Sequence, residues 1–310
     1  MSLQYEKGTW TGDGSVTATT QTITLADASL TPIAIKCWTT GPGAAGSFSA
    51  GAIFSMGFGT RRGGSTQTGC VGIFSADAVA TGDTARVRNS TLLDVLANAT
   101  TRDYSVNLIS FAAGQFVVSY SASGNSGDIF HYEVWGGADL TDANVINATL
   151  NSTGATQSIT GAGFTPDVVQ CLDSDLATTG TITAALGFSH GWASSASLYG
   201  CFAITATDGD TMTNTMNWNV AYRTAACLER LLTNADTSDA EWALNAFTSD
   251  GCTLGVVDAP GSTDRIATFL FIKGGQAAAS TAATAYYATD IFGKEAATDK
   301  TILGADSATK

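Results

Sequence analysis

The chain has 310 residues, and its 14 Lys and Arg against 27 Asp and Glu give a formal net charge of −13. This balance argues against binding nucleic-acid phosphates or an anionic membrane surface, because both need clustered basic side chains. Hydrophobic residues make up 44% of the chain, which argues against disorder. The chain contains no run of 18 apolar residues, so we expect no membrane-spanning helix. The start MSLQYEKGTW lacks the apolar core of a signal peptide.

The chain begins with a segment that we expect to be an arm, residues 1–14. It carries Leu3, Tyr5 and Trp10 as apolar anchors. From residue 15 onward, short segments rich in β-branched and aromatic residues alternate with Gly, Asn, Asp and Ser clusters, a pattern that predicts strands and turns. The predicted strands of this first stretch are 21–25, 32–38, 52–58, 68–76, 115–122 and 128–135. The segment TLLDVLANA (91–99) is predicted to be a short helix, with an extended crossover between strands as the alternative.

The second part of the chain repeats the first. FTPDVVQCL (164–172) matches LTPIAIKCW (30–38), and GCFAITATD (200–208) matches GCVGIFSAD (69–77). Between them, Gly57-Phe58 pairs with Gly187-Phe188 at a similar offset. A glycine repeated inside a strand indicates a place where another backbone or an aromatic ring comes close. AACLERLLTNA (225–235) falls where the first copy has its predicted helix.

These patterns predict an all-β fold of two tandem antiparallel β-sandwich, jelly-roll-like modules, each with a short helix. Module 1 spans 15–140, module 2 spans 150–276, and a C-terminal arm occupies 277–310. The arm is rich in Ala and Thr, and its large apolar residues suggest that it orders against a neighbouring subunit, although a disordered terminus is the alternative. These residues are Tyr286, Tyr287, Ile291, Phe292, Ile302 and Leu303.

The sequence offers few candidates for chemistry. His131 and His190 are the two histidines, and no GxSxG motif supports a serine hydrolase built on either. Glu133 is the strand carboxylate considered for a glycosidase, which needs two opposed acids. The acid pairs Asp173/Asp175 and Asp208/Asp210 have calcium-ligand spacing but no EF-hand pattern, so we expect turns. We therefore predict no catalytic residue, no cofactor and no metal.

Two further groups have mainly structural interpretations. The six cysteines form no CxxC pair, so we expect buried free thiols rather than a zinc or redox site. They are Cys37, Cys70, Cys171, Cys201, Cys227 and Cys252. RVR (86–88), with Arg61 and Arg62, is a small basic cluster that the second copy lacks. A solvated loop is the favoured interpretation of this cluster, and a face that forms ion pairs with an acidic neighbour is the alternative.

The repeated blocks resemble a β-sandwich module of tailed-bacteriophage structural proteins. The resemblance rests on GFTPDVVQCLDSD, ALGFS, YGCFAITATDGD, AFTSDGCTLGV and FLFIKGG, which occur in this order in the second copy. The first copy departs from it, with LTPIAIKCW in place of GFTPDVV. The matched positions are glycines, a proline and aromatics, so the resemblance carries over no catalytic residue.

The resemblance implies a virion structural protein, such as a head-decoration, spike or tail-associated protein, made in the host cytoplasm. Its partners would be other copies of itself, in twofold or threefold contacts, and other virion proteins. The alternative is a carbohydrate-binding adhesin for a host-surface glycan, with exposed aromatics stacking on sugars. The candidate aromatics are Trp38, Trp192, Trp218 and Trp242, although we expect Trp38 to lie in the core.

Overall fold

The computed structural model describes residues 4–15, 19–41, 52–76, 81–151, 155–209, 218–231, 238–258 and 264–274. These residues form antiparallel β-sheets, and among them the sole helical element is the 3-10 turn η1 (Ser123–Asn125). The prediction of a nearly all-β chain is therefore confirmed.

The first half of the described chain, residues 4–136, forms two sheets. Inner sheet 1 contains, in spatial order, β1 (Gln4–Thr11), β10 (Ile129–Gly136), β3 (Pro32–Thr39), β4 (Ala52–Arg62), β5 (Ser65–Ser75) and β6 (Thr84–Asn89). Outer sheet 1 contains β2 (Thr20–Thr24), β9 (Gln115–Tyr120), β8 (Arg102–Ala112) and β7 (Leu93–Leu96).

The second half, residues 140–274, forms another two sheets. Inner sheet 2 contains β11 (Leu140–Leu150), β21 (Arg265–Gly274), β13 (Val168–Asp173), β15 (Leu186–Ser195), β16 (Leu198–Ala206) and β17 (Trp218–Arg223). Outer sheet 2 contains β12 (Thr156–Thr160), β20 (Gly251–Asp258), β19 (Ser238–Thr248) and β18 (Leu228–Leu231). One further strand of this half, β14 (Ile182–Ala184), pairs with β6 and so extends inner sheet 1.

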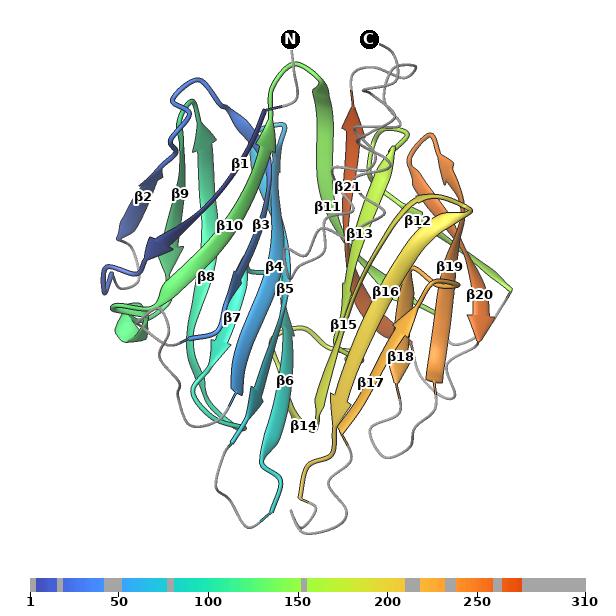
Figure 1. The fold of residues 1–310 in the computed structure, drawn as a ribbon. Coiled ribbons are helices and arrows are strands. Elements are labelled where there is room, and N and C mark those ends of the chain that lie inside the picture. The colour runs from blue at the N-terminus through green and yellow to red at the C-terminus, as the bar shows by residue number, and fades with distance from the viewer. Residues whose placement is uncertain are drawn as a thin grey trace, which may run out of the picture.

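The four sheets lie as successive layers, with the inner sheets facing each other (Figure 1). Each half has its own core between its inner and outer sheet, with Phe116 and Trp10 in the first half and Trp242 and Phe269 in the second. A third apolar core, which includes Phe58, Val145, Phe188 and Leu270, lies between the two inner sheets. The two halves are therefore joined by a buried sheet-on-sheet contact.

The burial of each strand follows its place in these layers. In β9, at the outside, Phe116, Val118 and Tyr120 are buried and alternate with half-buried residues, as in a strand with one solvated face. In β13, between two cores, every residue from Val168 to Asp173 is buried. A continuous apolar run such as VVQCL is thus explained by a strand that is covered on both faces.

A repeated row of Cys, Gly and Cys crosses the two inner sheets. In the first half Gly57 of β4 lies between Cys37 and Cys70, and in the second half Gly191 of β15 lies between Cys171 and Cys201. The sequence alignment paired Gly57 with Gly187 instead. That pairing is four residues out of register, because the strand partners place Gly191 in the equivalent position.

The two predicted short helices are wrong. The structure has the strands β7 and β18 in these segments, and all residues of both strands are buried. Leu93 and Val95 contact the core of the first half, whereas Leu96 packs in a small cluster with Phe74 and Val87. Because apolar residues point to both faces of such a strand, their spacing imitates the periodicity of a helix.

The N-terminal arm differs from the prediction as well. Residues 4–11 form β1, which pairs with β10 along its whole length. Trp10 is buried, stacks on Phe130 at a centroid distance of 4.7 Å, and donates its indole N–H to the Tyr120 hydroxyl at 2.9 Å. Tyr5 packs against the core between the inner sheets. Leu3 lies outside the described residues, as do Tyr286, Tyr287, Ile291, Phe292, Ile302 and Leu303 of the C-terminal arm.

Candidate functional site

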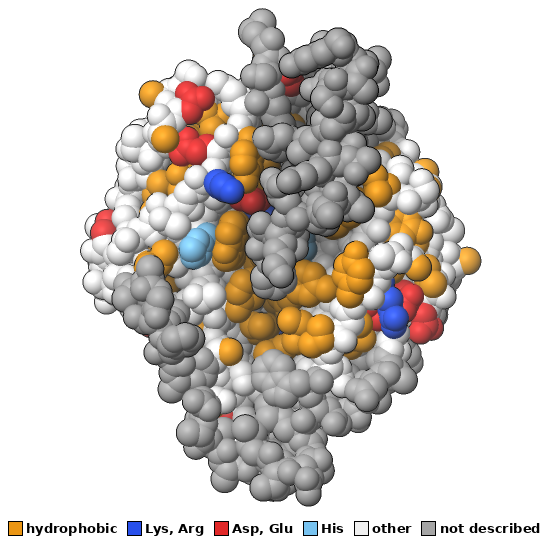
Figure 2. All heavy atoms as spheres, viewed as in Figure 1, with side chains coloured by type: hydrophobic (Ala, Val, Ile, Leu, Met, Phe, Trp, Pro, Cys, Tyr) orange, Lys and Arg blue, Asp and Glu red, His pale blue; other side chains and the backbone are white. Residues whose placement is uncertain are grey.

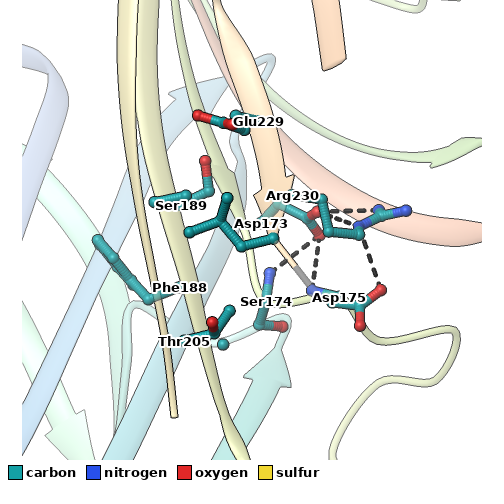
Figure 3. A pocket seen from close by; sticks show the side chains of 11 residues that line it. Asp173, Ser174, Asp175, Phe188, Ser189, Thr205, Glu229 and Arg230 are labelled. Carbon is teal, nitrogen blue, oxygen red and sulfur yellow. Dashed lines mark hydrogen bonds and ion pairs between the residues drawn. The ribbon is translucent and has the colours of Figure 1, made fainter. Parts of the chain in front are cut away.

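A largely buried network of arginines and aspartates lies where the second half meets the first. Figure 3 shows its central part, Asp173, Asp175 and Arg230. Arg230 of β18 forms ion pairs with Asp173 at the end of β13 (2.8 Å) and with Asp175 (3.1 Å). Arg265 of β21 also contacts Asp175, at 2.8 Å. Arg86 of β6 reaches Asp175 from the first half at 3.5 Å. The network therefore ties β13, β18 and β21 together and links them to inner sheet 1.

The local backbone holds these carboxylates in place. The Asp173 carboxylate accepts hydrogen bonds from the N–H groups of Ser174 (2.9 Å) and Asp175 (3.1 Å), which closes a tight turn after β13. Asp175 takes the left-handed conformation at φ +57°, which Asp tolerates better than most residues. Arg86 donates to the carbonyl oxygens of Ala184 and Ala185 at 3.2 and 2.9 Å. The turn and the strand β14 thus fit around one guanidinium group.

The cavity beside this network is too small for a substrate. It is lined by Asp173, Asp175, Phe188, Glu229 and Arg230, and its volume is about 10 Å³. That volume accommodates about one water molecule. Burial raises the pKa of Asp175, and Arg230 partly offsets the rise. The Asp173 and Asp175 carboxylates at this cavity are both paired with Arg230.

Two further arginines of the first half contact the second half. Arg88 is buried and donates to Asn147 (2.6 Å), Thr179 (2.7 Å) and Thr268 (3.3 Å). Arg62 pairs with Asp142 at 3.1 Å on a more exposed rim. The favoured interpretation of the basic cluster as a solvated loop is therefore wrong for Arg62, Arg86 and Arg88. These residues face acidic and polar partners within their own chain.

A second polar cluster is built on inner sheet 1. Lys36 of β3 and Glu133 of β10 are opposite each other in the sheet, both are buried, and their charged groups lie 2.6 Å apart. Tyr5 donates its hydroxyl to the Glu133 carboxylate at 3.2 Å. The carboxylate considered for a glycosidase is thus held by a lysine and a tyrosine. Beside it, Trp38 stacks on His131 at a centroid distance of 5.5 Å, and both rings are half-buried.

His190 is the buried histidine that faces this cluster. It lies on β15 between the rings of Phe58 (6.3 Å) and Phe202 (5.9 Å), and its Nε2 has no hydrogen-bond partner. Burial, and to a smaller extent the charge of Lys36, lowers the pKa of His190 to about 3. The imidazole is therefore neutral at physiological pH.

This neutral histidine predicts a pH-dependent stability. In the unfolded chain a histidine has a pKa of about 6.5, so below that pH the unfolded state binds a proton that the folded state does not. The free energy of unfolding therefore decreases as the pH is lowered from about 6.5 toward about 3. At about pH 4.5, His190 alone lowers the free energy of unfolding by about 2–3 kcal/mol relative to neutral pH. Replacing His190→Gln should remove this part of the pH dependence, measured by urea unfolding at neutral and acid pH.

His131→Gln is the matched control for that experiment. His131 is half-buried, and burial lowers its pKa as well, so its removal should flatten the profile by less than that of His190. Stability profiles of the wild type and His190→Gln that run parallel between about pH 7 and 4.5 would contradict the assignment.

The remaining candidate residues are dispersed. Asp208 is exposed and accepts the Thr84 N–H at 2.8 Å, while Asp210 lies outside the described residues. Trp242 is fully buried under Arg230, and Trp38 and Trp192 are half-buried. Trp38 therefore lies at the margin of the core between the inner sheets rather than inside it. All six cysteines are free and buried, as predicted.

Within the described ranges, no group of three or more His, Cys, Asp or Glu side chains is arranged to hold a metal ion. No helix in the same ranges is long and apolar enough to cross a membrane. Comparison of the chain with protein-family models, curated proteins and solved structures finds no match.

Proposed function

We propose that the chain is a structural protein of the tailed-phage virion type, built from two tandem β-sandwich modules and acting through contacts with copies of itself and other virion proteins. The observation that carries the proposal is the third apolar core, between the two inner sheets. In this core the apolar face of one module packs on the apolar face of the other. We infer that β-sheet faces of the same kind can also pack between copies of the chain, because sheet-on-sheet packing buries apolar residues from both faces.

The duplication is supported by the order of the strands. Inner sheet 1 has the order β1-β10-β3-β4-β5-β6, and inner sheet 2 has the order β11-β21-β13-β15-β16-β17. Counting strands within each half and leaving out β14, the two orders are the same, and so are those of the outer sheets. The buried strand β7 reads LDVL and β18 reads LERL, each with a fully buried acid. Asp94 pairs with Arg102 (2.6 Å) and Glu229 with Arg223 (2.9 Å).

A structural role without catalysis is supported by the partners of three carboxylates in the interior or at its margin. Asp173, Asp175 and Glu133 each form an ion pair with a basic side chain of the same chain. A glycoside hydrolase would need two such carboxylates to face a bound substrate.

Light scattering of the purified full-length chain tests the proposal. We expect a defined oligomer of about two or three copies at micromolar concentration, because homo-oligomers with closed symmetry dominate among assembling proteins. As a control, the chain is measured at low and high salt, since apolar sheet contacts should survive salt that weakens charge contacts. A monomer at every concentration would contradict the proposal.

The second candidate is a glycan-binding adhesin of the virion. It is favoured by the half-exposed pair of Trp38 and His131, with the Lys36 ammonium 5.6 Å from the centre of the indole. Aromatic side chains with a few polar groups are the usual lining of small-ligand sites. A glycan array would support this candidate if binding is specific and is lost in Trp38→Ala.

A further inference from the structure

An apolar strip lies on the face of inner sheet 2 that is turned toward inner sheet 1. Phe202 and Ile204 on β16 are directly opposite Tyr222 and Val220 on β17, so all four side chains share one face. Phe202 and Ile204 pack against the core between the inner sheets. The strip is therefore the outer margin of that core. Figure 2 shows apolar side chains gathered across the middle of the molecule in the view of Figure 1.

The outer side of the strip is unusually exposed. Val220 is 71% exposed and Tyr222 is 72% exposed, which makes them the most exposed of the large apolar residues of the described chain. Within the described part of β17, the one charged residue is Arg223, whose guanidinium group turns to Glu229 and Glu241. Edge strands are usually protected by charge or proline. An apolar strip at a sheet margin without this protection indicates a docking surface.

The C-terminal segment has the length and composition to cover this strip. β21 ends at Gly274, and residues 275–285 (GQAAASTAATA) contain no large apolar side chain. The first large apolar residues after this spacer are Tyr286 and Tyr287, followed by Ile291 and Phe292. A spacer followed by a group of aromatic anchors is the pattern of a tethered docking segment.

The geometry of the sheet allows the segment to reach the strip of its own chain. The strand partners place Thr268, Leu172, His190, Phe202 and Tyr222 in one row across inner sheet 2. Gly274 lies about 20 Å from Thr268 along β21, and Tyr222 lies about 19 Å from Thr268 across the strands. The direct distance from Gly274 to Tyr222 is therefore about 28 Å. The 12 residues from Gly274 to Tyr286 extend to about 40 Å. A tether that exceeds the span by this margin gives the segment a high effective concentration at the strip.

We propose that the C-terminal segment 275–310 docks on the strip of Phe202, Ile204, Val220 and Tyr222 of the same chain, with Tyr286, Tyr287, Ile291 and Phe292 as its anchors. The apolar margin of the core is then covered in the free protein. This inference does not rest on the virion function, because it applies equally to a monomer.

Disulfide formation between engineered cysteines tests the docking in the full-length chain. The six native thiols are buried, so Val220→Cys with Tyr287→Cys supplies the reactive pair. We expect an intrachain disulfide to form under mild oxidation by glutathione disulfide, at least about tenfold faster than in the matched control, because docking raises the effective concentration of the two thiols. The control combines Tyr287→Cys with Val257→Cys, a position that is 55% exposed on outer sheet 2.

A third variant separates docking from mere tethering. Adding Ile291→Ser and Phe292→Ser to the Val220→Cys and Tyr287→Cys pair should slow the intrachain link to the rate of the Val257 control. Non-reducing gels distinguish the outcomes. An interchain link at Val220 would overturn docking in the same chain while supporting assembly, and equal rates at Val220 and Val257 would overturn docking altogether.

Discussion

Replacing Gly191→Ala is expected to destabilise the protein by at least about 3 kcal/mol, because overpacking a tight backbone contact forces the layers apart. A Cβ atom at Gly191 would overlap the carbonyl oxygen of Cys227 and press on the side chain of Cys201. Gly57→Ala should cost a similar amount, since a Cβ atom there would overlap the carbonyl oxygen of Leu92 and press on Cys70. Urea unfolding of the two variants against the wild type measures both effects.

Gly200→Ala is the matched control in the same sheet. It lies on β16 next to Cys201, and the nearest atom to an added Cβ would be the carbonyl oxygen of Arg223 at 3.4 Å, an ordinary contact. Gly200→Ala is expected to change the free energy of unfolding by no more than about 1 kcal/mol, because alanine also restricts the unfolded chain. If Gly191→Ala and Gly200→Ala were equally stable, the close approach of inner and outer sheets at Gly191 would be disproved.

These glycines illustrate which features of the fold the sequence predicts. The repeated Gly57 indicated a close approach inside a strand, and the backbone of Leu92 does approach it. The predicted strands of the first half match β2, β3, β4, β5, β9 and β10, because alternation and β-branched runs are local patterns. The strands β1, β6 and β8 were not predicted. The positions of β7 and β18 were not predictable, since their burial on both faces is set by layers that are distant in sequence. The register of the repeat between Gly57 and Gly191 likewise required the strand partners.

The charged network between the halves could not be predicted from local pattern. RVR in β6 looks like a solvated basic cluster, yet Arg86 and Arg88 are buried against residues about 60 to 180 positions away. Arg230 lies within AACLERLLTNA, the segment where we predicted the second short helix. One signal was available: a strand that carries arginines within apolar surroundings must have its charges paired, because an unpaired buried charge is strongly unfavourable. That signal predicts the presence of partners but not their identity.

Replacing Arg230→Met is expected to destabilise the protein by about 3–5 kcal/mol, because it leaves the buried Asp173 without its cation. Asp173 and Arg230 are both almost fully buried, and the guanidinium group also lies 4.9 Å from the centre of the Trp242 ring. Methionine keeps much of the apolar stem against Trp242, so the loss reports mainly on the charge. Thermal and urea unfolding should both show it, and the transition should remain cooperative.

The matched comparison is Arg62→Met, which removes the exposed ion pair with Asp142 on the rim of the same interface. Its side chain is 38% exposed, so solvent screens the pair and the expected cost is about 0–1 kcal/mol. A double variant, Arg230→Met with Asp173→Leu, should recover part of the loss, because an apolar pair leaves no unpaired charge in the interior. If Arg230→Met cost no more than Arg62→Met, the buried network would be dispensable, and the apolar contacts between the sheets would suffice to hold the layers together.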